Sequence, residues 1–413
     1  MESYRSQIRG GVRAWVWLSA ILLLCSRSEA QFGTPFSSGS TGVDGALNIT
    51  TPGVTYFNPT ALNLTKNTNI FNFTTITIAA GSTLKFWEGV FHGPVFLLAS
   101  GDVTINGTID ITGDASPGPT ASGAQQGISF AGSGGYSGGL GGIHGDPNHA
   151  ALPGNGPGGG AAGDINSSNT WAVGGTFSGD QFLVPLVGGS GGGGTNDNGQ
   201  FGAQGGAGGG AILIASSTKI TFDGQGKGTA NILAYGGNGN GRGCGGSGGA
   251  VRLVSNSIMG ANSFGINMST QGGGACKSGP GYGLARIEAN STNFSSSDFA
   301  GATAVQFSVP YALNLPTAPL PVISVTSVGG IAINANPFSF PDATINTSSP
   351  VPVVITATNV PLTSTVTMYL LSDKGPNQTI PVTLTGTNTA STATVNVTFP
   401  SIGTRGFVKA VFQ

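Results

Sequence analysis

Three stretches decide the fold: Gly210-Ala-Ile-Leu-Ile-Ala-Ser-Ser217, Gly249-Ala-Val-Arg-Leu-Val-Ser-Asn256 and Gly283-Leu-Ala-Arg-Ile-Glu-Ala-Asn290. Each is a short apolar run that follows a glycine-rich segment. Ala211 and Ala250 are 39 residues apart, and Arg252 and Arg286 are 34 apart. Repeats of this length are typical of solenoids, because one unit cannot bury its apolar face alone and stacked units bury a continuous column.

The apolar residues of these units follow a β-strand pattern. Val103 and Ile105, and then Ile109 and Ile111, alternate with polar residues at a period of two. Glycine makes up 73 of the 413 residues, and each glycine costs a helix about 1 kcal/mol relative to alanine. We therefore expect an all-β chain with a glycine-rich parallel β-helix or solenoid over residues 81–315, in which glycine permits tight corners and close backbone approach.

Composition divides the rest of the chain. Residues 31–80 are rich in Thr and Asn and are expected to form an N-terminal β cap. Residues 316–413 contain six candidate strands separated by turn residues, which predicts an immunoglobulin-like β-sandwich. The segment Leu315-Pro-Thr-Ala-Pro-Leu-Pro321 is expected to be a stiff linker before it.

The first 30 residues are typical of a secretory signal peptide. Arg5, Arg9 and Arg13 precede an apolar run from Ala14 to Cys25, and small residues end at Ala30. The alternative is an uncleaved membrane anchor, but a bilayer span needs about 20 apolar residues, and the run from Ala14 to Cys25 is shorter than that. We expect cleavage before Gln31, a secreted, extracellular or cell-surface location, and no transmembrane span afterwards.

The charge balance excludes some partners. The chain has 15 basic and 16 acidic residues, and removal of four Arg and two Glu with the signal leaves 11 and 14. Nucleic-acid binding requires a basic patch, which this composition does not supply. So few charges also leave few general acids or bases, and no cofactor is expected.

Two cysteines remain after the signal, Cys244 and Cys276. They precede Arg252 and Arg286 by 8 and 10 residues, so they occupy similar places in successive repeats. Adjacent strands lie about 4.8 Å apart, within the range that a disulfide spans. We expect a disulfide in an oxidising compartment; two buried free thiols are the alternative.

The glycine-rich segments 132–160 and 188–210 are too long for simple corners. They fit ordered excursions, polyproline-II-like strands or disorder, and the sequence does not choose among them. The repeated Gly-Gly-Ala units at residues 209–213 and 248–253 resemble those of glycine-rich secreted bacterial surface proteins with a parallel β-helix body and an immunoglobulin-like tail. This resemblance implies a surface or matrix location more than a reaction.

Candidate catalytic residues are the acidic group Asp102, Asp110 and Asp114. Glycoside hydrolysis uses two positioned carboxylates, so these residues are the candidates for a polysaccharide lyase or hydrolase. The alternative is that they are solvated strand and turn positions. The Asn-Thr-Asp, Gly-His-Gly and Arg-Ile-Lys triplets of pectinases are absent.

Candidate metal ligands are His144, Asp146 and His149, since imidazole and carboxylate groups bind Zn²⁺. Asp146-Pro147 equally predicts an ordinary polar turn. Residues 195–199 offer oxygen atoms to Ca²⁺ but are more typical of an Asn-Gly turn. Arg252 and Arg286 are expected to lie on successive repeats and face solvent.

These observations favour a secreted or cell-surface structural or adhesin-like protein that presents a β-solenoid to extracellular polysaccharide or matrix. The alternative is a carbohydrate-active β-helix enzyme. The small number of charged residues favours the structural or adhesin-like function over the enzyme.

Overall fold

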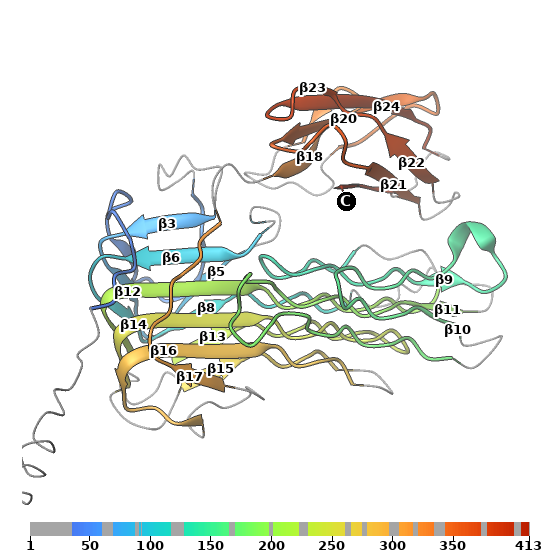
Figure 1. Cartoon of the computed structure of the whole chain (residues 1–413). Coiled ribbons are helices and arrows are strands. Elements are labelled where there is room, and N and C mark those ends of the chain that lie inside the picture. The colour runs from blue at the N-terminus through green and yellow to red at the C-terminus, as the bar shows by residue number, and fades with distance from the viewer. Residues whose placement is uncertain are drawn as a thin grey trace, which may run out of the picture. The chain divides into compact units, whose positions relative to one another are not determined.

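The described part of the chain is built from β-strands (Figure 1). The computed structural model describes residues 35–59, 69–86, 91, 93–116, 128–164, 170–197, 201–222, 230–260, 266–274, 279–296, 305–316, 321–333, 343–372, 378–399 and 406–412. The predicted signal peptide lies outside these residues. The expected all-β class is confirmed.

The strands before residue 316 are short at first and longer later. They are β1 (Leu47–Ile49), β2 (Gly53–Tyr56), β3 (Ile70–Phe73), β4 (Ile76–Ile78), β5 (Ser82–Lys85), β6 (Val95–Ala99), β7 (Val103–Ile105), β8 (Thr108–Asp110), β9 (Gly142–Ile143), β10 (Gly163–Asp164), β11 (Thr195–Asp197), β12 (Ala211–Phe222), β13 (Ala230–Leu233), β14 (Ala250–Gly260), β15 (Ile266–Ser269), β16 (Leu284–Thr292) and β17 (Val305–Ser308). A 3-10 turn, η1, covers Pro147–His149.

These strands form three sheets in which every pairing is parallel. The large sheet has the order β1-β4-β7-β12-β14-β16-β17, with β3-β6 also joined to β12. The second sheet has the order β15-β13-β8-β5-β2. The small sheet has the order β10-β11-β9. Ala211 pairs with Ala250 and Arg252 with Arg286, as the repeat spacing predicts.

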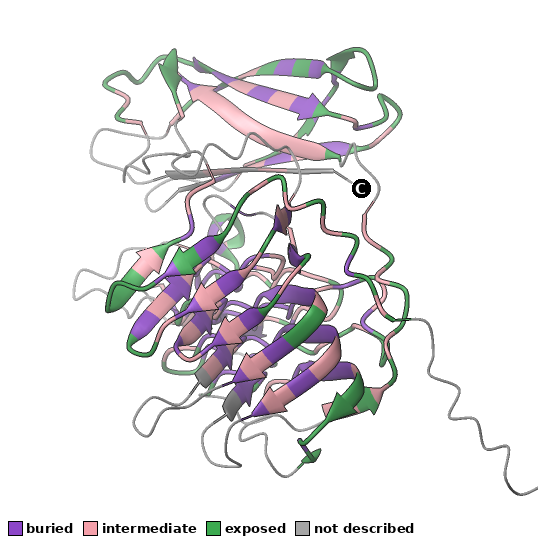
Figure 2. Ribbon diagram, turned by 90° about the vertical axis from the view of Figure 1, so that its left-hand side faces the viewer, coloured by how far each residue is buried: buried purple, intermediate pink, exposed green. Residues whose placement is uncertain are grey.

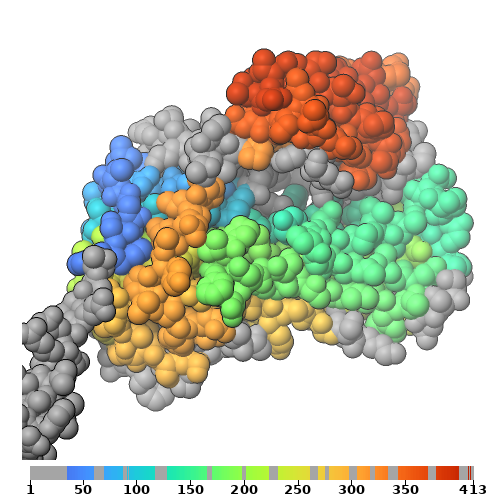
Figure 3. Space-filling model, viewed as in Figure 1, coloured from blue at the N-terminus to red at the C-terminus, as the bar shows by residue number. Residues whose placement is uncertain are grey.

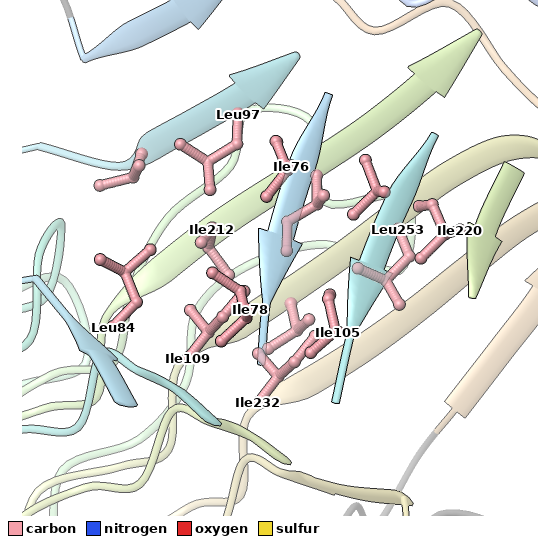
Figure 4. Packing of buried hydrophobic residues seen from close by; sticks show 14 of the residues in the cluster. Ile76, Ile78, Leu84, Leu97, Ile105, Ile109, Ile212, Ile220, Ile232 and Leu253 are labelled. Atoms are coloured by element: carbon pink, nitrogen blue, oxygen red, sulfur yellow. The ribbon is translucent and has the colours of Figure 1, made fainter. Parts of the chain in front are cut away.

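The core lies between the large and second sheets. In-register pairing aligns Ile76 with Val103 and Ile220 along the large sheet, and Leu84 with Ile109 and Ile232 along the second. Their side chains meet in one aliphatic cluster (Figure 4). Buried and partly exposed residues alternate along the short strands (Figure 2). The period-two pattern thus selects the residues that the stack buries.

Between the strands, glycine-rich segments lie side by side and bond to one another through their backbones (Figure 1). We call them the glycine bundle: segments 132–142, 151–163, 172–176, 188–195, 202–210, 234–249, 270–274 and 279–283. The backbone N–H groups of segment 188–195 that donate to the same neighbouring segment are three residues apart in the sequence. A period of three is that of a polyproline II helix, which makes no hydrogen bonds within itself. The bonds that show the period run from the N–H groups of Gly189, Gly192 and Thr195 to the carbonyls of Gly209, Gly206 and Ala203, and from Gly191 and Gly194 to Asn155 and Leu152.

The carbonyls of segment 188–195 follow the same period. They accept from Tyr136 and Gly139 on one side, from Cys244 and Ser247 on a second, and from Gly160 and Gly163 on a third. Together with a bond from Gly193 to Val173, the segment is hydrogen-bonded to five other segments of the bundle. Backbone groups that have no partner within their own helix are therefore satisfied by surrounding segments.

Close backbone approach is the reason that these positions are glycine. A Cβ atom on Gly192 would collide with the carbonyl oxygen of Cys244, and one on Gly205 with that of Gly192. Neither glycine has a positive φ, so the requirement is steric and comes from the neighbouring chain. The space-filling view shows this part of the chain, in green, as a closely filled surface (Figure 3).

The C-terminal part contains two antiparallel sheets. Its strands are β18 (Val322–Val328), β19 (Ile331–Ala332), β20 (Val351–Thr358), β21 (Val366–Ser372), β22 (Gln378–Val382), β23 (Thr385–Gly386), β24 (Ser391–Val397) and β25 (Gly406–Phe412). The orders are β19-β18-β20-β24-β23 and β22-β21-β25. A separate buried cluster, which includes Val353, Ile355, Met368 and Leu370, belongs to these sheets. At least one strand overlaps each of the six segments that the sequence predicts.

The expectation that Arg252 and Arg286 face solvent is wrong. Both are buried, and both bind the fully buried carboxylate of Glu288. The Nε atoms of Arg252 and Arg286 lie 2.8 and 2.6 Å from Glu288 Oε1. Strand alternation correctly places these side chains on the outer side of the large sheet, but other parts of the chain cover them.

The cover is the strap, which we define as residues 308–313. The Tyr311 N–H donates to Glu288 Oε2 at 2.8 Å, and Arg252 donates to the carbonyls of Ala312 and Leu313 at 3.2 and 3.3 Å. Arg286 donates to Ser308 Oγ at 2.8 Å. The chain after β17, in orange, crosses the large sheet at this place (Figures 1 and 3). The buried charges thus hold the strap on the sheet.

We expect Gly192→Ala to destabilise the protein by about 2–4 kcal/mol, because the added methyl group forces adjacent backbones apart. Chemical denaturation measures the change. Gly279→Ala is the matched control, since a Cβ there meets nothing within 4 Å. Equal unfolding free energies for the two variants would contradict the packing argument.

We expect Glu288→Ala to cost about 3–5 kcal/mol of unfolding free energy, because it leaves two buried guanidinium groups without their carboxylate. Asp102→Ala removes an exposed ion pair with Lys219 and is expected to cost less than about 1 kcal/mol. Thermal and urea unfolding of both variants provide the comparison. A loss for Glu288→Ala no larger than that for Asp102→Ala would refute the structural role of the network.

Candidate functional site

The second sheet continues into the glycine bundle, and the backbone changes period there. Beyond β8, β13 and β15, the hydrogen bonds between neighbouring chains are first two residues apart, as in strands, and then three apart. The change occurs at the same level in the three neighbouring segments that follow β8, β13 and β15. The bonds run from Ile111, Gly113 and Ser116 to the carbonyls of Leu233, Tyr235 and Asn238, and from Ala234, Gly236 and Gly239 to those of Ser269, Gln271 and Gly274.

A groove of about 360 Å³, open to solvent, lies at this change of period. Three polar side chains line it: Tyr235, Asn238 and Gln271. Ala115 and four glycines form the rest of the lining. Tyr235 is half-buried, whereas Asn238 and Gln271 are exposed. The lining therefore combines one aromatic ring with two amides.

Asp114 lies between two residues of the groove lining, Gly113 and Ala115. Packed backbone around its carboxyl group removes water and raises the pKa of Asp114, although the residue as a whole is exposed. The positive charge of Lys85 lowers that pKa and the negative charge of Asp110 raises it, both with smaller effect. Asp114 thus protonates more readily than an aspartate in water.

The other two candidate carboxylates are engaged in ion pairs. Asp110 Oδ2 lies 3.3 Å from Lys85 Nζ, and Asp110 Oδ1 accepts from the N–H and hydroxyl of Thr112. Asp102 lies 3.3 Å from Lys219 Nζ, beside the large sheet. Asp110 and Asp114 therefore share an electrostatic neighbourhood, and Asp102 belongs to a different sheet.

The histidine cluster divides into two separate pairs. His144 Nδ1 lies 3.0 Å from Asp164 Oδ1, while His149 Nδ1 lies 2.6 Å from Asp146 Oδ2. The hydrogen bond from His149 lowers the pKa of Asp146. Across the described residues, no three His, Cys, Asp or Glu side chains are placed to hold one metal ion. His92 lies outside the described residues.

Two further expectations concern residues that are only partly described. Cys244 is buried, with its Sγ 2.9 Å from the carbonyl oxygen of Ala172, but Cys276 lies outside the described residues, so the disulfide stays a prediction. Of the segment considered for Ca²⁺, residues 195–197 form β11, and residues 198–199 lie outside the described part.

The sequence analysis did not predict this groove. Tyr235 ends an apolar run that predicts a strand, and Asn238 and Gln271 lie among glycines without a recognisable motif. The usable signal is that two runs, 230–235 and 266–271, each end in a large polar side chain just before glycine. Their lateral pairing then places Tyr235 beside Gln271.

No protein-family model, curated protein or solved structure matches this chain. Within the ranges that the structure describes, we find no helix with the length and apolar character needed to cross a membrane. The site must therefore be interpreted from its own chemistry.

We expect Asp114→Asn to raise the melting temperature at pH 7 and to leave it nearly unchanged at pH 3. The folded state disfavours ionised Asp114, since its pKa is raised above the ordinary value of 3.8. The resulting cost sets in as pH rises through the unfolded and then the folded pKa, and it is absent below both. Asp102→Asn serves as the control. A lower melting temperature for Asp114→Asn at pH 7 would contradict the desolvation argument.

Proposed function

We propose that this chain is a secreted or cell-surface structural and adhesive protein that contacts extracellular polysaccharide or matrix. The observation that carries the proposal is how its few charged side chains are used. Glu288 and its two arginines lie in a buried network, and Asp102 and Asp110 each bind a lysine. The remaining support of the body comes from the aliphatic cluster between the sheets and from the hydrogen-bonded backbone of the glycine bundle. Such a body supports binding by shape and neutral polar contacts.

We further propose that the parallel sheets form a β-solenoid and that residues 316–413 form an immunoglobulin-like domain. In-register parallel pairing over the repeats supports the first. Two antiparallel sheets with their own buried cluster support the second. The signal-like first 30 residues favour export, and the predicted disulfide between Cys244 and Cys276 would be consistent with it.

A carbohydrate-active enzyme is the second candidate. Asp114, with its raised pKa, lies beside the groove and near Asp110. An acid with raised pKa beside an ionised carboxylate is the arrangement that glycoside hydrolysis uses. The lysine bound to Asp110 opposes this assignment, because it stabilises a carboxylate that would otherwise act as base or nucleophile.

The test is a sedimentation assay of the chain from Gln31 onward on insoluble polysaccharides, with reducing ends measured in the same samples. We expect retention on at least one polysaccharide without release of sugar. Turnover that Asp110→Ala or Asp114→Asn abolishes would replace the adhesive function by the enzymatic one. Absence of retention on every polysaccharide and on matrix protein would refute the adhesive proposal.

A further inference from the structure

We propose that the groove at Tyr235, Asn238 and Gln271 is a binding subsite for a short stretch of a neutral glycan chain. This inference rests on the proposed adhesive function and assigns it to one place on the molecule. The groove volume, about 360 Å³, lies at the low end of the range for small-ligand sites. It therefore suits a few sugar units of a longer chain that extends beyond it.

The aromatic ring supplies the apolar contact. A sugar ring has an apolar C–H face and a rim of hydroxyl groups, and a half-exposed tyrosine offers an apolar face with a polar tip. The backbone on both sides of Tyr235 is fixed, since its carbonyl accepts from Gly113 and the next N–H donates to Gln271. The ring is thus attached to chains that are held on both sides, which lowers the entropy lost on binding.

The amides supply hydrogen bonds of both kinds. Asn238 Oδ1 accepts from the Gly274 N–H at 2.6 Å, which fixes the amide and leaves its NH₂ group as donor. Exposed Gln271 carries a donor and an acceptor. Sugar hydroxyls are both donors and acceptors, so they match a pair of neutral amides without a charged group.

The floor of the groove is backbone and cannot be filled by mutation to larger residues. A Cβ on Gly236 would collide with the carbonyl oxygen of Gly246, and one on Gly237 with that of Asp114. Packing against the bundle therefore requires glycine at these positions, so this part of the groove stays bare backbone. Ligand and bare backbone can then approach closely.

The charge at the groove selects against anionic chains. Among the described residues that line the groove, none is Lys or Arg, and Asp114 at its edge repels negative charge when ionised. Polyuronates and sulfated glycans would be disfavoured. The described lining therefore offers no cation of the kind that a phosphate ligand requires.

The experiment measures the dissociation constants of cellohexaose, xylohexaose, mannohexaose and polygalacturonate for the chain from Gln31 onward, by calorimetry at pH 7. We expect at least one neutral hexasaccharide to bind, and polygalacturonate to bind at least tenfold more weakly. Tyr235→Ala and Gln271→Ala should weaken the neutral ligand, Tyr235→Ala by tenfold or more. Tyr56→Ala is the matched control and should change it less than twofold, because Tyr56 is exposed and lies on β2, at the opposite edge of the second sheet.

A steric variant keeps the test decisive if Tyr235→Ala unfolds. Ala115→Trp places a large ring in the groove from an exposed position, so it should abolish binding while the melting temperature stays at the wild-type value. Wild-type binding by both Tyr235→Ala and Ala115→Trp would overturn the subsite. So would tighter binding of polygalacturonate, or no binding of any neutral hexasaccharide. If these variants still sediment with polysaccharide, the assignment of glycan binding to this groove is wrong. The adhesive function proposed above would then still hold.

Discussion

The structure depends on direct contact between peptide backbones. In the glycine bundle, chains approach so closely that a Cβ atom would overlap a neighbouring carbonyl oxygen. Segment 188–195 consequently bonds to five other segments of the bundle, with a three-residue period. This contact continues the hydrogen bonding of the sheets into regions that have almost no side chains to form a hydrophobic core. Glycine excess is therefore a packing requirement here.

Backbone packing also determines where side chains remain available. Where the second sheet changes period, bare glycine backbone borders the groove, and the described side chains that line it are neutral. Asp114 lies at the edge of this groove, whereas Asp102, Asp110 and Glu288 are held in ion pairs with lysine or arginine side chains. Recognition at this surface thus depends on shape, one aromatic ring and amide groups.

Sequence reasoning succeeded where apolar residues recur in a regular pattern. The strands at residues 211–222, 250–260 and 284–292, and their lateral pairing, follow from the repeated apolar runs and the repeat spacing. It failed for Arg252 and Arg286, since alternation gives the side of a sheet and cannot reveal a distant segment that covers it. It left residues 188–210 undecided because a glycine run has no side chain to mark a period of three. The partners of His144 and Asp110 depend on chains brought together by the fold.

The strap has a mechanical consequence. Tension on the chain beyond residue 313 acts first on the bonds from Arg252 to the carbonyls of Ala312 and Leu313. Those bonds lie on β14, two strands inward from the edge strand β17. Load is therefore applied to the interior of the large sheet, where several bonds must break together, and β17 is shielded from being peeled off one hydrogen bond at a time. Rupture under force is governed by the unfolding barrier, and this anchoring raises it for a protein held by its C-terminal end.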